Sequence, residues 1–339
     1  MKELNLGFVG AGANARAHMK SVAALEAVRV AAVYDVDAER AQAAAQEYGA
    51  KAYPDLRAML DTEPLDALYI SIPPFAHGEP EKLAAEHRLD VYIEKPVALS
   101  LEQGLEICAA LEEAGVITCV GYQLRYFPAT QQAKVYLADK TIAMVVHHRW
   151  GGYSGQPWWR VMEQSGGQLV EQTTHGVDLM RYLAGEIVEV YAKYARRVMH
   201  EVPNFTIPDS QMVLVEFASG ALGCISTGCF STGGGAGGML TFLLRDRRVE
   251  WQAQGLQLFP PDPTLEELEV PRYPSADEVF IEAVRNRDPA RILSPYRDAL
   301  KTLEVTLAAN ESARTGRPVA TTCVRGDKGE SCLGGCSVA

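Results

Sequence analysis

A glycine-rich turn between a strand and a helix is the sequence feature that most limits the folds open to this chain. The apolar run Leu4–Val9 is followed by the motif GAGANA, which begins at Gly10, and helix-forming residues come directly after it. The order matches G-x-G-x-x-A, in which Gly10 permits a tight turn, Gly12 lets the backbone approach a pyrophosphate, and small Ala15 keeps helix and sheet close. A helix N-terminus also favours an anion. The segment therefore predicts a dinucleotide-binding turn rather than an ordinary glycine-containing one.

The acid that ends the next strand indicates which dinucleotide is bound. Val28–Tyr34 is a second apolar run, and Asp35 follows it. A carboxylate at this position accepts hydrogen bonds from the ribose hydroxyls and repels a 2′-phosphate. Asp37 adds negative charge, and no arginine is adjacent to either acid in the sequence. The sequence therefore predicts NAD rather than NADP as the cofactor.

Strand-like and helix-like segments alternate after Asp35, as is typical of a parallel sheet with helices on both faces. Ser100 and Gly115 bracket one helical segment as an N-cap and a C-terminal stop. The pattern predicts an α/β fold whose residues 1–122 form an N-terminal Rossmann dinucleotide-binding domain. The expected strands are 4–9, 28–34, 66–71, 91–93 and 116–121, and the expected helices 16–25, 38–48, 77–87 and 100–113.

The pattern changes after about residue 122. A helix at 128–138 leads into strand-like runs rich in β-branched residues, and two helices at 276–285 and 295–314 close the chain. We expect a C-terminal α+β domain over 123–322, with a large, mostly antiparallel open sheet, and a flexible tail over 323–339. The strand-like runs are 142–150, 187–198, 211–217, 221–229, 239–244 and 247–252.

The tripeptide Glu94-Lys95-Pro96 ends one of the predicted parallel strands. A lysine at the carboxyl end of such a strand points into the crevice where an α/β sheet binds its ligand. The proline restricts the backbone beyond it, and Glu94 offers the ammonium group a possible partner. This placement predicts that Lys95 is held against the reactive end of the bound cofactor.

A second group of ionisable residues lies in the C-terminal half. If the chain is helical from near Leu169, the spacing of Glu171, His175 and Asp178 places them within about 60° of arc on one face. Such a face is either a solvated stripe or a site, and the small residues that flank it leave space for a ligand. A histidine can take a proton at neutral pH, as is needed when an alcohol loses hydride.

The tryptophans before this segment have two interpretations. Trp158 and Trp159 stand in a loop flanked by glycine and proline, and they form either a stacking wall for a sugar ring or part of the core. We expect His147, His148 and Arg149 on a strand that faces solvent or a subunit partner.

Composition restricts the class of protein. The chain has 339 residues, is 47% hydrophobic and 22% charged, and so has ample material for two soluble domains. Its formal charge of −11 argues against nucleic acid as a partner. No run is long enough to span a membrane, and no signal peptide pattern is present. The seven scattered cysteines suit reduced thiols in a cytoplasm, and no cluster has the spacing of metal ligands.

Together these motifs resemble the Gfo/Idh/MocA family of oxidoreductases over residues 4–320. Residues 71–77 resemble the family's loop over the cofactor, 94–96 its Glu-Lys-Pro tripeptide, and 120–126 its interdomain segment. The stretch through His175 is similar to its motif G-G-x-x-x-D-x-G-x-H-x-x-D. The chain departs from that motif at Glu171, which replaces aspartate, and at Thr173, which replaces glycine, so the substrate pose is less defined than the hydride chemistry.

The resemblance implies an NAD-dependent dehydrogenase that acts on a CH–OH group of a sugar, polyol or related alcohol. It implies that His175 takes the hydroxyl proton, that Lys95 hydrogen-bonds the alkoxide, and that Glu171 holds a neighbouring hydroxyl or orients His175. The residues expected to bind the cofactor are Gly10, Gly12, Ala13, Asn14, Asp35, Ile72, Pro73, His77, Glu94, Lys95 and Gln123. Those expected to contact the substrate are Lys95, Tyr122, Arg125, Trp158, Trp159, Arg160, Glu171, His175 and Asp178.

Two other functions remain open at this point. The chain could be a redox-neutral glycosidase or lyase that uses tightly bound NAD, or a non-catalytic sensor that binds a dinucleotide. The presence of both Lys95 and His175 argues against the sensor. We also expect a homodimer or homotetramer through the second sheet, because the Rossmann domain and local helices can cover only one of its faces.

Overall fold

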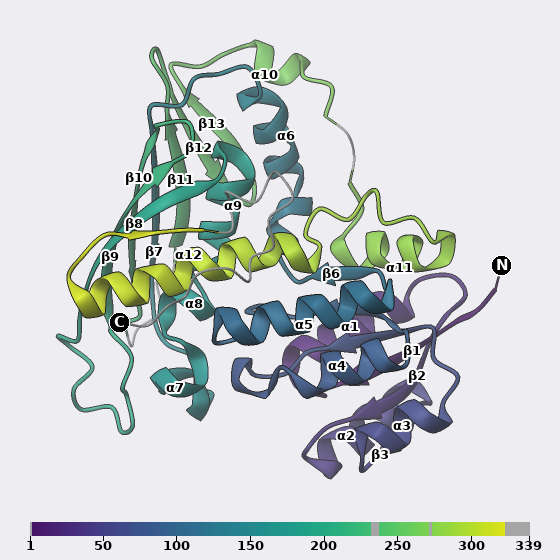
Figure 1. The fold of residues 1–339 in the computed structure, drawn as a ribbon. Helices are drawn as coiled ribbons and strands as arrows, with labels where there is room; N and C mark the ends of the chain where they lie inside the picture. Colours follow the sequence, from purple (N-terminus) through teal and green to yellow (C-terminus); the bar gives the residue numbers. More distant parts are fainter. Residues whose placement is uncertain (1, 232–236, 271–272, 323–339) are drawn as a thin grey trace. The chain divides into compact units, whose positions relative to one another are not determined.

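The computed structural model describes residues 2–231, 237–270 and 273–322, which form two compact units (Figure 1). Unit 1 comprises Met1–Gln131, Val161–Gly166 and Val270–Leu300, and unit 2 comprises Gln132–Arg160, Gly167–Glu269 and Lys301–Ala339. The chain therefore passes between the units several times. The predicted flexible tail, 323–339, lies outside the described residues.

Unit 1 is built on a six-stranded sheet with the order β3-β2-β1-β4-β5-β6, and all of its strand pairs are parallel. Every residue of the interior strands β4 and β5 is buried, as expected where helices cover both faces. The predicted Rossmann architecture is confirmed. The strands are β1 (Leu4–Val9), β2 (Val28–Tyr34), β3 (Lys51–Tyr53), β4 (Ala67–Ile70), β5 (Asp90–Ile93) and β6 (Thr118–Val120).

The helices of unit 1 begin and end at the residues that local chemistry favours. The side chain of Asp37 caps α2 and that of Ser100 caps α5, while Gly49 and Gly115 end these helices in the left-handed region. The sequence missed β3 and α3, which are short. The helices are α1 (Ala13–Ala23), α2 (Ala38–Tyr48), α3 (Leu56–Thr62), α4 (Glu79–Glu86), α5 (Leu101–Ala114), α7 (Met162–Ser165) and α11 (Ala276–Asn286), with 3-10 turns η1 (Pro74–Ala76) and η2 (Gln123–Tyr126).

An aromatic cluster forms the centre of the unit 1 core. The rings of Tyr69 and Tyr92 stack with centroids 4.9 Å apart, and Phe8 stacks on Tyr69 at 4.8 Å. Phe280 of α11 packs edge-on against both tyrosines. A helix that is remote in sequence is therefore part of the dinucleotide-domain core, and this was not predicted.

Unit 2 contains an eight-stranded sheet with the order β13-β12-β11-β7-β10-β9-β8-β14. Its strand pairs are antiparallel except for β7 with β10, which confirms the predicted, mostly antiparallel second sheet. The strands are β7 (Met144–Trp150), β8 (Ile187–Ala195), β9 (Ser210–Phe217), β10 (Leu222–Gly228), β11 (Gly237–Leu243), β12 (Arg248–Gln252), β13 (Gly255–Phe259) and β14 (Val319–Ala320).

The two faces of this sheet differ in burial. Successive residues of β9 alternate between buried and exposed positions, as in a half-buried strand. The buried face packs against α8 (Gln168–Glu171) and α9 (Thr174–Ala184), which are coloured teal in Figure 1. The remaining helices are α6 (Pro128–Leu137), α10 (Thr264–Glu267) and α12 (Tyr296–Thr315), and α6 and α12 have residues in both units.

His147 lies on the buried face, although the sequence suggested that it faces solvent or a partner. Its Nδ1 donates to the Met239 carbonyl at 3.0 Å, and its Nε2 lies so close to α9 that a Cβ on Gly176 would be 2.0 Å away. Alternation along β7 explains the error, because His147 and Val145 share the inner face. Burial lowers the pKa of His147 to about 4.

The depressed pKa predicts how unit 2 responds to acid. Because His147 is neutral when folded, its contribution to stability is complete above pH 6.5 and is lost as pH falls toward 4. Between pH 6.5 and 4 we expect the free energy of unfolding to fall by about 3 kcal/mol less in His147→Gln than in the wild type. Glutamine at this position can keep the bond to Met239. All four tryptophans lie in unit 2, so urea unfolding followed by tryptophan fluorescence reports on this unit. If acid lowers the free energy of unfolding equally in His147→Gln and the wild type, His147 is not the buried neutral group that this prediction assumes.

Candidate active site

The glycine-rich turn has the geometry that its sequence predicts. Gly10 has a φ of 98°, and a Cβ there would lie 2.2 Å from the Ser71 carbonyl oxygen, so a side chain is excluded. The turn therefore passes directly over the end of β4. Gly12 differs, because a Cβ at this position would meet nothing within 4 Å. The open space beside Gly12 fits a ligand that approaches the backbone.

The N-terminus of α1 lies beside this space. Gly12 is the N-cap, and within the described residues no side chain caps the helix and no acid occupies its first turn. Ala13 and Asn14 are exposed, whereas Ala15 is buried in the core. The first turn thus offers backbone N–H groups and no competing negative charge to a pyrophosphate.

Asp35 is held by the same turn. Its Oδ2 accepts the Ala11 N–H at 2.7 Å and its Oδ1 accepts the Asp37 N–H at 2.8 Å. The structure corrects one sequence observation: Arg40, although not adjacent in sequence, lies 3.2 Å from Asp35 and 3.1 Å from Asp37. The first turn of α2 brings it there. The ribose end of the site therefore contains a cation already balanced by two carboxylates.

The loop after β4 lies next to the turn. Ile72 Cγ2 is 3.3 Å from the Cβ position of Gly10, and Pro73 is partly buried. The His77 side chain is fully buried, with Nδ1 2.5 Å from Glu81 Oε1. The other Glu81 oxygen accepts the Gly78 N–H at 2.7 Å. His77 thus fixes the loop to α4, and sequence analysis missed its partner Glu81.

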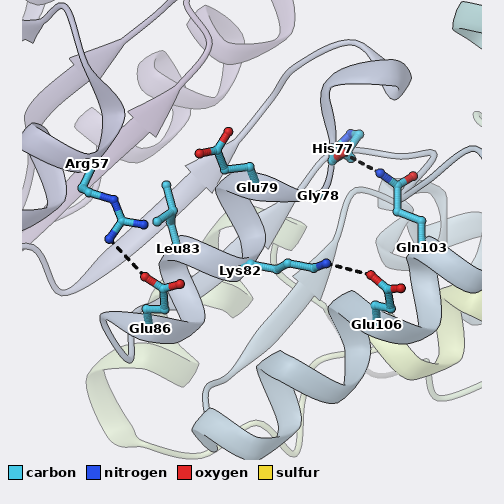
Figure 2. A pocket seen from close by; sticks show the side chains of 9 residues that line it. All are labelled: Arg57, His77, Gly78, Glu79, Lys82, Leu83, Glu86, Gln103 and Glu106. Atoms are coloured by element: carbon cyan, nitrogen blue, oxygen red, sulfur yellow. Dashed lines mark hydrogen bonds and ion pairs between the residues drawn. The ribbon is translucent and has the colours of Figure 1, made fainter.

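A hollow of about 480 Å³ opens beside this loop, between α3, α4 and α5 (Figure 2). It is bordered by the exposed ion pairs Arg57–Glu86 at 3.2 Å and Lys82–Glu106 at 2.7 Å. Gln103 also donates to the His77 carbonyl there. Of the predicted site residues only His77 borders it, so this hollow is distinct from the dinucleotide turn.

Glu94 and Lys95 adopt different environments at the end of β5. The Glu94 carboxylate is buried and lies 3.1 Å from Nε2 of His18, a residue that sequence analysis did not select. Lys95 is partly exposed, and its peptide bond to Pro96 is cis. Glu94, which the sequence offered as a possible partner of the Lys95 ammonium group, thus has the His18 imidazole as a partner within unit 1.

The segment after β6 contributes one exposed and two buried side chains. Gln123 is exposed, whereas Tyr122 and Arg125 are almost fully buried. The Arg125 guanidinium lies 2.6 Å from Asp298 and also donates to the Leu293 carbonyl. In unit 1, Arg125 therefore ties η2 to the segment that leads into α12.

In unit 2 the predicted helix through Glu171 and His175 is interrupted. α8 ends at Glu171, and α9 begins at Thr174. The Thr173 N–H bonds to the Gln168 carbonyl, and its Oγ1 lies 2.6 Å from Thr227 Oγ1 in β10. This side-chain contact with the sheet holds the break in place. Glu171 and His175 therefore do not lie on one continuous helix, which the predicted arc had assumed.

Glu171 has a partner from the preceding loop. Trp159 Nε1 donates to its carboxylate, and the Trp159 side chain is buried. Trp159 is thus a core residue with its polar edge on Glu171, and of the two stacking candidates only Trp158 is partly exposed. Arg149 faces the same interior, where burial lowers its pKa and the Glu171 carboxylate opposes that shift. Sequence analysis placed Arg149 outward, and β-strand alternation explains the error.

His175 and Asp178 differ in exposure along α9. His175 lies in the first turn of α9 and is half-buried. Arg160, which lies outside this helix, is also half-buried. Asp178 is almost fully buried and accepts a hydrogen bond from Thr302 at 3.0 Å, while Arg181 donates to the same hydroxyl. The Asp178–Thr302 bond links α9 to α12 within unit 2.

The parallel sheet, the turn at Gly10 and the acid at Asp35 define a Rossmann protein with a dinucleotide site. The sequence comparisons agree: residues 4–122 match the model described as "Oxidoreductase family, NAD-binding Rossmann fold", and residues 138–250 match the GFO/IDH/MocA C-terminal domain. The chain therefore belongs to the GFO/IDH/MocA family of oxidoreductases. The predictions of the family and of NAD as the cofactor are confirmed.

Individual relatives differ in their named activities. The chain is 26% identical to scyllo-inositol 2-dehydrogenase (NAD(+)) of Bacillus subtilis over 94% of this chain and 96% of that protein. It is 28% identical to the 2,7-anhydro-N-acetylneuraminate hydratase of Escherichia coli, but the match spans 66% of this chain and 62% of the hydratase. The WlbA dehydrogenase of Bordetella pertussis, solved with NADH and UDP-GlcNAcA, has the same fold, with a TM-score of 0.83 at 23% identity over 94% of this chain and 98% of that one.

Further findings concern helix length, metal ligands and cysteines in the described residues. No helix in the described part of the chain is long and apolar enough to cross a membrane. Among the same residues there is no group of three or more histidine, cysteine, aspartate or glutamate side chains able to hold a metal ion. The cysteines described are Cys108, Cys119, Cys224 and Cys229, and all four are free thiols.

The contacts of Asp35 predict how its loss alters cofactor choice. We expect the wild type to bind NAD well ahead of NADP, and Asp35→Ser to reverse or abolish this preference without a second substitution. The reason is that Asp35→Ser removes the charge that repels a 2′-phosphate and releases Arg40 to bind it. Dissociation constants for both dinucleotides measure the change. Asp35→Ser/Arg40→Ala is the matched control and should lose the gain for NADP; equal NADP affinity in both variants would contradict the role of Arg40.

Proposed function

We propose that this protein is an NAD-dependent dehydrogenase that oxidises a secondary hydroxyl of a sugar, polyol or related alcohol. The observation that carries the proposal is the turn at Gly10 and Gly12 together with Asp35, next to a sheet edge that also presents Lys95. The full-length match to a scyllo-inositol dehydrogenase supports the substrate class. Incubation with NAD and a panel of sugars, inositols and hydroxy acids tests it, with absorbance at the NADH band as the readout.

The cofactor would be held by the glycine turn, the α1 N-terminus, Asp35 and the loop through Ile72 and Pro73. NAD, when bound, accepts hydride from the alcohol carbon or returns it. Lys95 would hydrogen-bond the substrate oxygen and stabilise the charge that develops as its proton leaves. His175 would take that proton as the general base. Family motifs at both positions support these roles.

Other residues would shape the substrate site. Glu171 would accept a bond from a second substrate hydroxyl or orient His175, and its fixed position against Trp159 supports such a role. Trp158, which is partly exposed, is the better candidate for stacking on a sugar ring. Tyr122, Arg125, Arg160 and Asp178 remain candidates for substrate contacts, although the described bonds of Arg125 and Asp178 have clear packing roles.

A redox-neutral reaction is the second candidate, because the Escherichia coli relative is named a hydratase. That match covers 62% of the hydratase, whereas the inositol dehydrogenase match covers 96% of the relative, so we prefer the dehydrogenase. The two differ in whether NADH leaves the protein. Product formation in the panel without net absorbance change would support the redox-neutral candidate.

The roles of Lys95 and His175 predict a pattern of losses. We expect Lys95→Ala to reduce turnover by about 10² or more while NAD still binds, because the glycine turn is untouched. His175→Ala should lose a comparable factor, partly regained at high pH where solvent replaces the base. The losses in the double variant should be far from additive, since both groups act on the same hydroxyl.

Steady-state kinetics and NAD titrations on the active panel compound measure these effects. Lys82→Ala, which removes an exposed lysine of unit 1, and His87→Ala are the matched controls and should retain turnover. Normal turnover in Lys95→Ala would refute the assignment and leave the tripeptide as a structural turn.

We also propose that the open face of the unit 2 sheet joins copies of this chain into a dimer or tetramer. Met212 and Leu214 of β9 and Leu222 of β10 are each more than half exposed. Strand register sets Leu222 beside Met144 of β7, so the apolar side chains lie on neighbouring strands. A contiguous apolar face of this kind is typical of a protein–protein interface.

This face predicts the effect of a single charge. We expect Leu214→Asp to convert an oligomer to a monomer at micromolar concentration, because a buried unpaired carboxylate would oppose association. Light scattering after size exclusion measures the mass. Val36→Asp, an equivalent change at an exposed apolar residue of unit 1, should leave the mass unchanged. A monomeric wild type would overturn the proposal.

A further inference from the structure

We propose that Arg149 binds the carboxylate of an acidic substrate, so that the alcohol which this protein accepts is a sugar acid or a related polyhydroxy acid. The inference rests on the function proposed above, because it specifies the substrate class of that dehydrogenase. It concerns residues of unit 2 alone. The motifs that resemble the family do not include Arg149.

The Arg149 guanidinium lies inside unit 2 without a counter-ion. Arg149 is half-buried on the covered face of β7, and its Nη1 is buried and has no hydrogen-bond partner. Within the described part of the chain Arg149 forms no ion pair, whereas Arg181 of the same unit lies 2.8 Å from Glu186. A cation held in an interior without an anion is costly. Its presence there indicates a ligand that supplies the opposite charge.

Two groups act on the Arg149 charge, and only one of them is ionised at neutral pH. Burial lowers the pKa of Arg149, and the Glu171 carboxylate and Cys229 oppose that shift. Burial raises the pKa of Cys229 to about 12, so its thiol is neutral. Glu171 accepts the Trp159 indole N–H and forms no ion pair with Arg149. The interior therefore holds a carboxylate and a guanidinium that are near each other but not paired.

The position beside Arg149 on the next strand leaves room for a ligand. Strand register sets Arg149 opposite Gly238 of β11, and residues that are opposite in an antiparallel pair point to the same face. Gly238 is exposed, and a Cβ there would meet nothing closer than the His148 carbonyl oxygen at 3.8 Å. Glycine therefore leaves space on the β11 side of Arg149.

On its other side Arg149 continues into a row of polar side chains. The row follows the strand register across the covered face from β7 to β8 and consists of Arg149, Thr227, Gln211 and Tyr194. Both amide atoms of Gln211 and the Tyr194 hydroxyl are buried and have no hydrogen-bond partner among the described residues. Buried polar groups are normally bonded. The row thus has hydrogen-bonding capacity that packing does not use, which suits a ligand with several hydroxyl groups.

The charges favour a carboxylate over a phosphate as the anionic group. A planar guanidinium binds a carboxylate through two parallel hydrogen bonds, and such charge-assisted bonds are stronger than neutral ones. Arg149 supplies one positive charge, and Glu171 adds a negative charge to the same interior. A phosphate dianion would be repelled more strongly by Glu171 than a carboxylate and would be only half neutralised by Arg149.

Isothermal titration calorimetry with NADH bound tests the proposal without turnover. The probes are pairs that differ in one carboxylate: D-gluconate with D-glucitol, and D-glucuronate with D-glucose. We expect the acid of at least one pair to bind about tenfold or more tightly than its neutral partner, and Arg149→Met to remove this difference. Arg248→Met, which removes an exposed arginine of β12, is the matched control and should keep it.

Three results of this titration would overturn the proposal. They are a wild type that prefers neither acid, an equal loss of preference in Arg248→Met, and tighter binding of D-glucose 6-phosphate than of D-glucuronate. The last result would assign the guanidinium to a phosphate instead.

The stability of the ligand-free protein separates a binding role from a structural one. Arg149 has no partner to lose, so Arg149→Met should unfold at the same or a higher urea concentration than the wild type, as followed by tryptophan fluorescence. Arg181→Met is the matched control and should unfold at a clearly lower concentration, because it removes the donor to Glu186 and Thr302. A destabilised Arg149→Met would show that Arg149 is a structural residue and would refute the inference.

These readouts distinguish the inference from the proposed function. Acid binding that depends on Arg149, with no NADH formed from any compound of the panel, would refute the dehydrogenase proposal alone. Oxidation of neutral polyols at equal rates in Arg149→Met and the wild type would refute this inference alone.

Discussion

The close approach of Gly10 to the Ser71 carbonyl is the constraint on which the rest of unit 1 depends. With a side chain at Gly10 the turn after β1 could not pass over the end of β4, and the Cβ position lies only 2.2 Å from the carbonyl oxygen. This contact sets α1 at the carboxyl edge of the sheet, with its N-terminal N–H groups beside the open space at Gly12. It also allows the Ala11 N–H to bond to Asp35, so the open space at Gly12 and the Asp35 carboxylate belong to one turn.

Buried charge is compensated locally in both units. In unit 1, His18 bridges two carboxylates, and in unit 2, Arg181 donates to Glu186 and to the hydroxyl that bonds Asp178. His147 shows the opposite solution, because burial without an acidic partner keeps it neutral. Isolated charges would be costly in these interiors, so each charged side chain links elements that packing alone would hold less specifically.

The two sheets differ in how their faces are covered. The parallel sheet of unit 1 is covered on both sides, which leaves its carboxyl edge as the place for a ligand. The sheet of unit 2 packs α8 and α9 on one face and leaves apolar residues exposed on the other. A face rich in methionine and leucine is available for association, while the covered face carries Glu171 and His175 on its helices.

Sequence alone determined the features that depend on neighbouring residues. The glycine turn, Asp35 after β2, the caps at Ser100 and Asp37, and the alternation along β9 all follow from local backbone and side-chain preferences. Family motifs added Lys95 and His175 as candidates.

Only the tertiary structure decided which distant side chains meet. His18 is separated from Glu94 by 76 positions and from Asp277 by 259, so no periodicity connects them, and sequence analysis did not select His18 as a partner of either carboxylate. The inward orientation of His147 and Arg149 was missed because alternation defines two faces without saying which is covered. The break before α9 was missed because it depends on the bond between Thr173 and Thr227, residues on different elements. Propensity describes a segment in isolation, whereas these contacts arise from the burial of polar groups that must find partners in the folded chain.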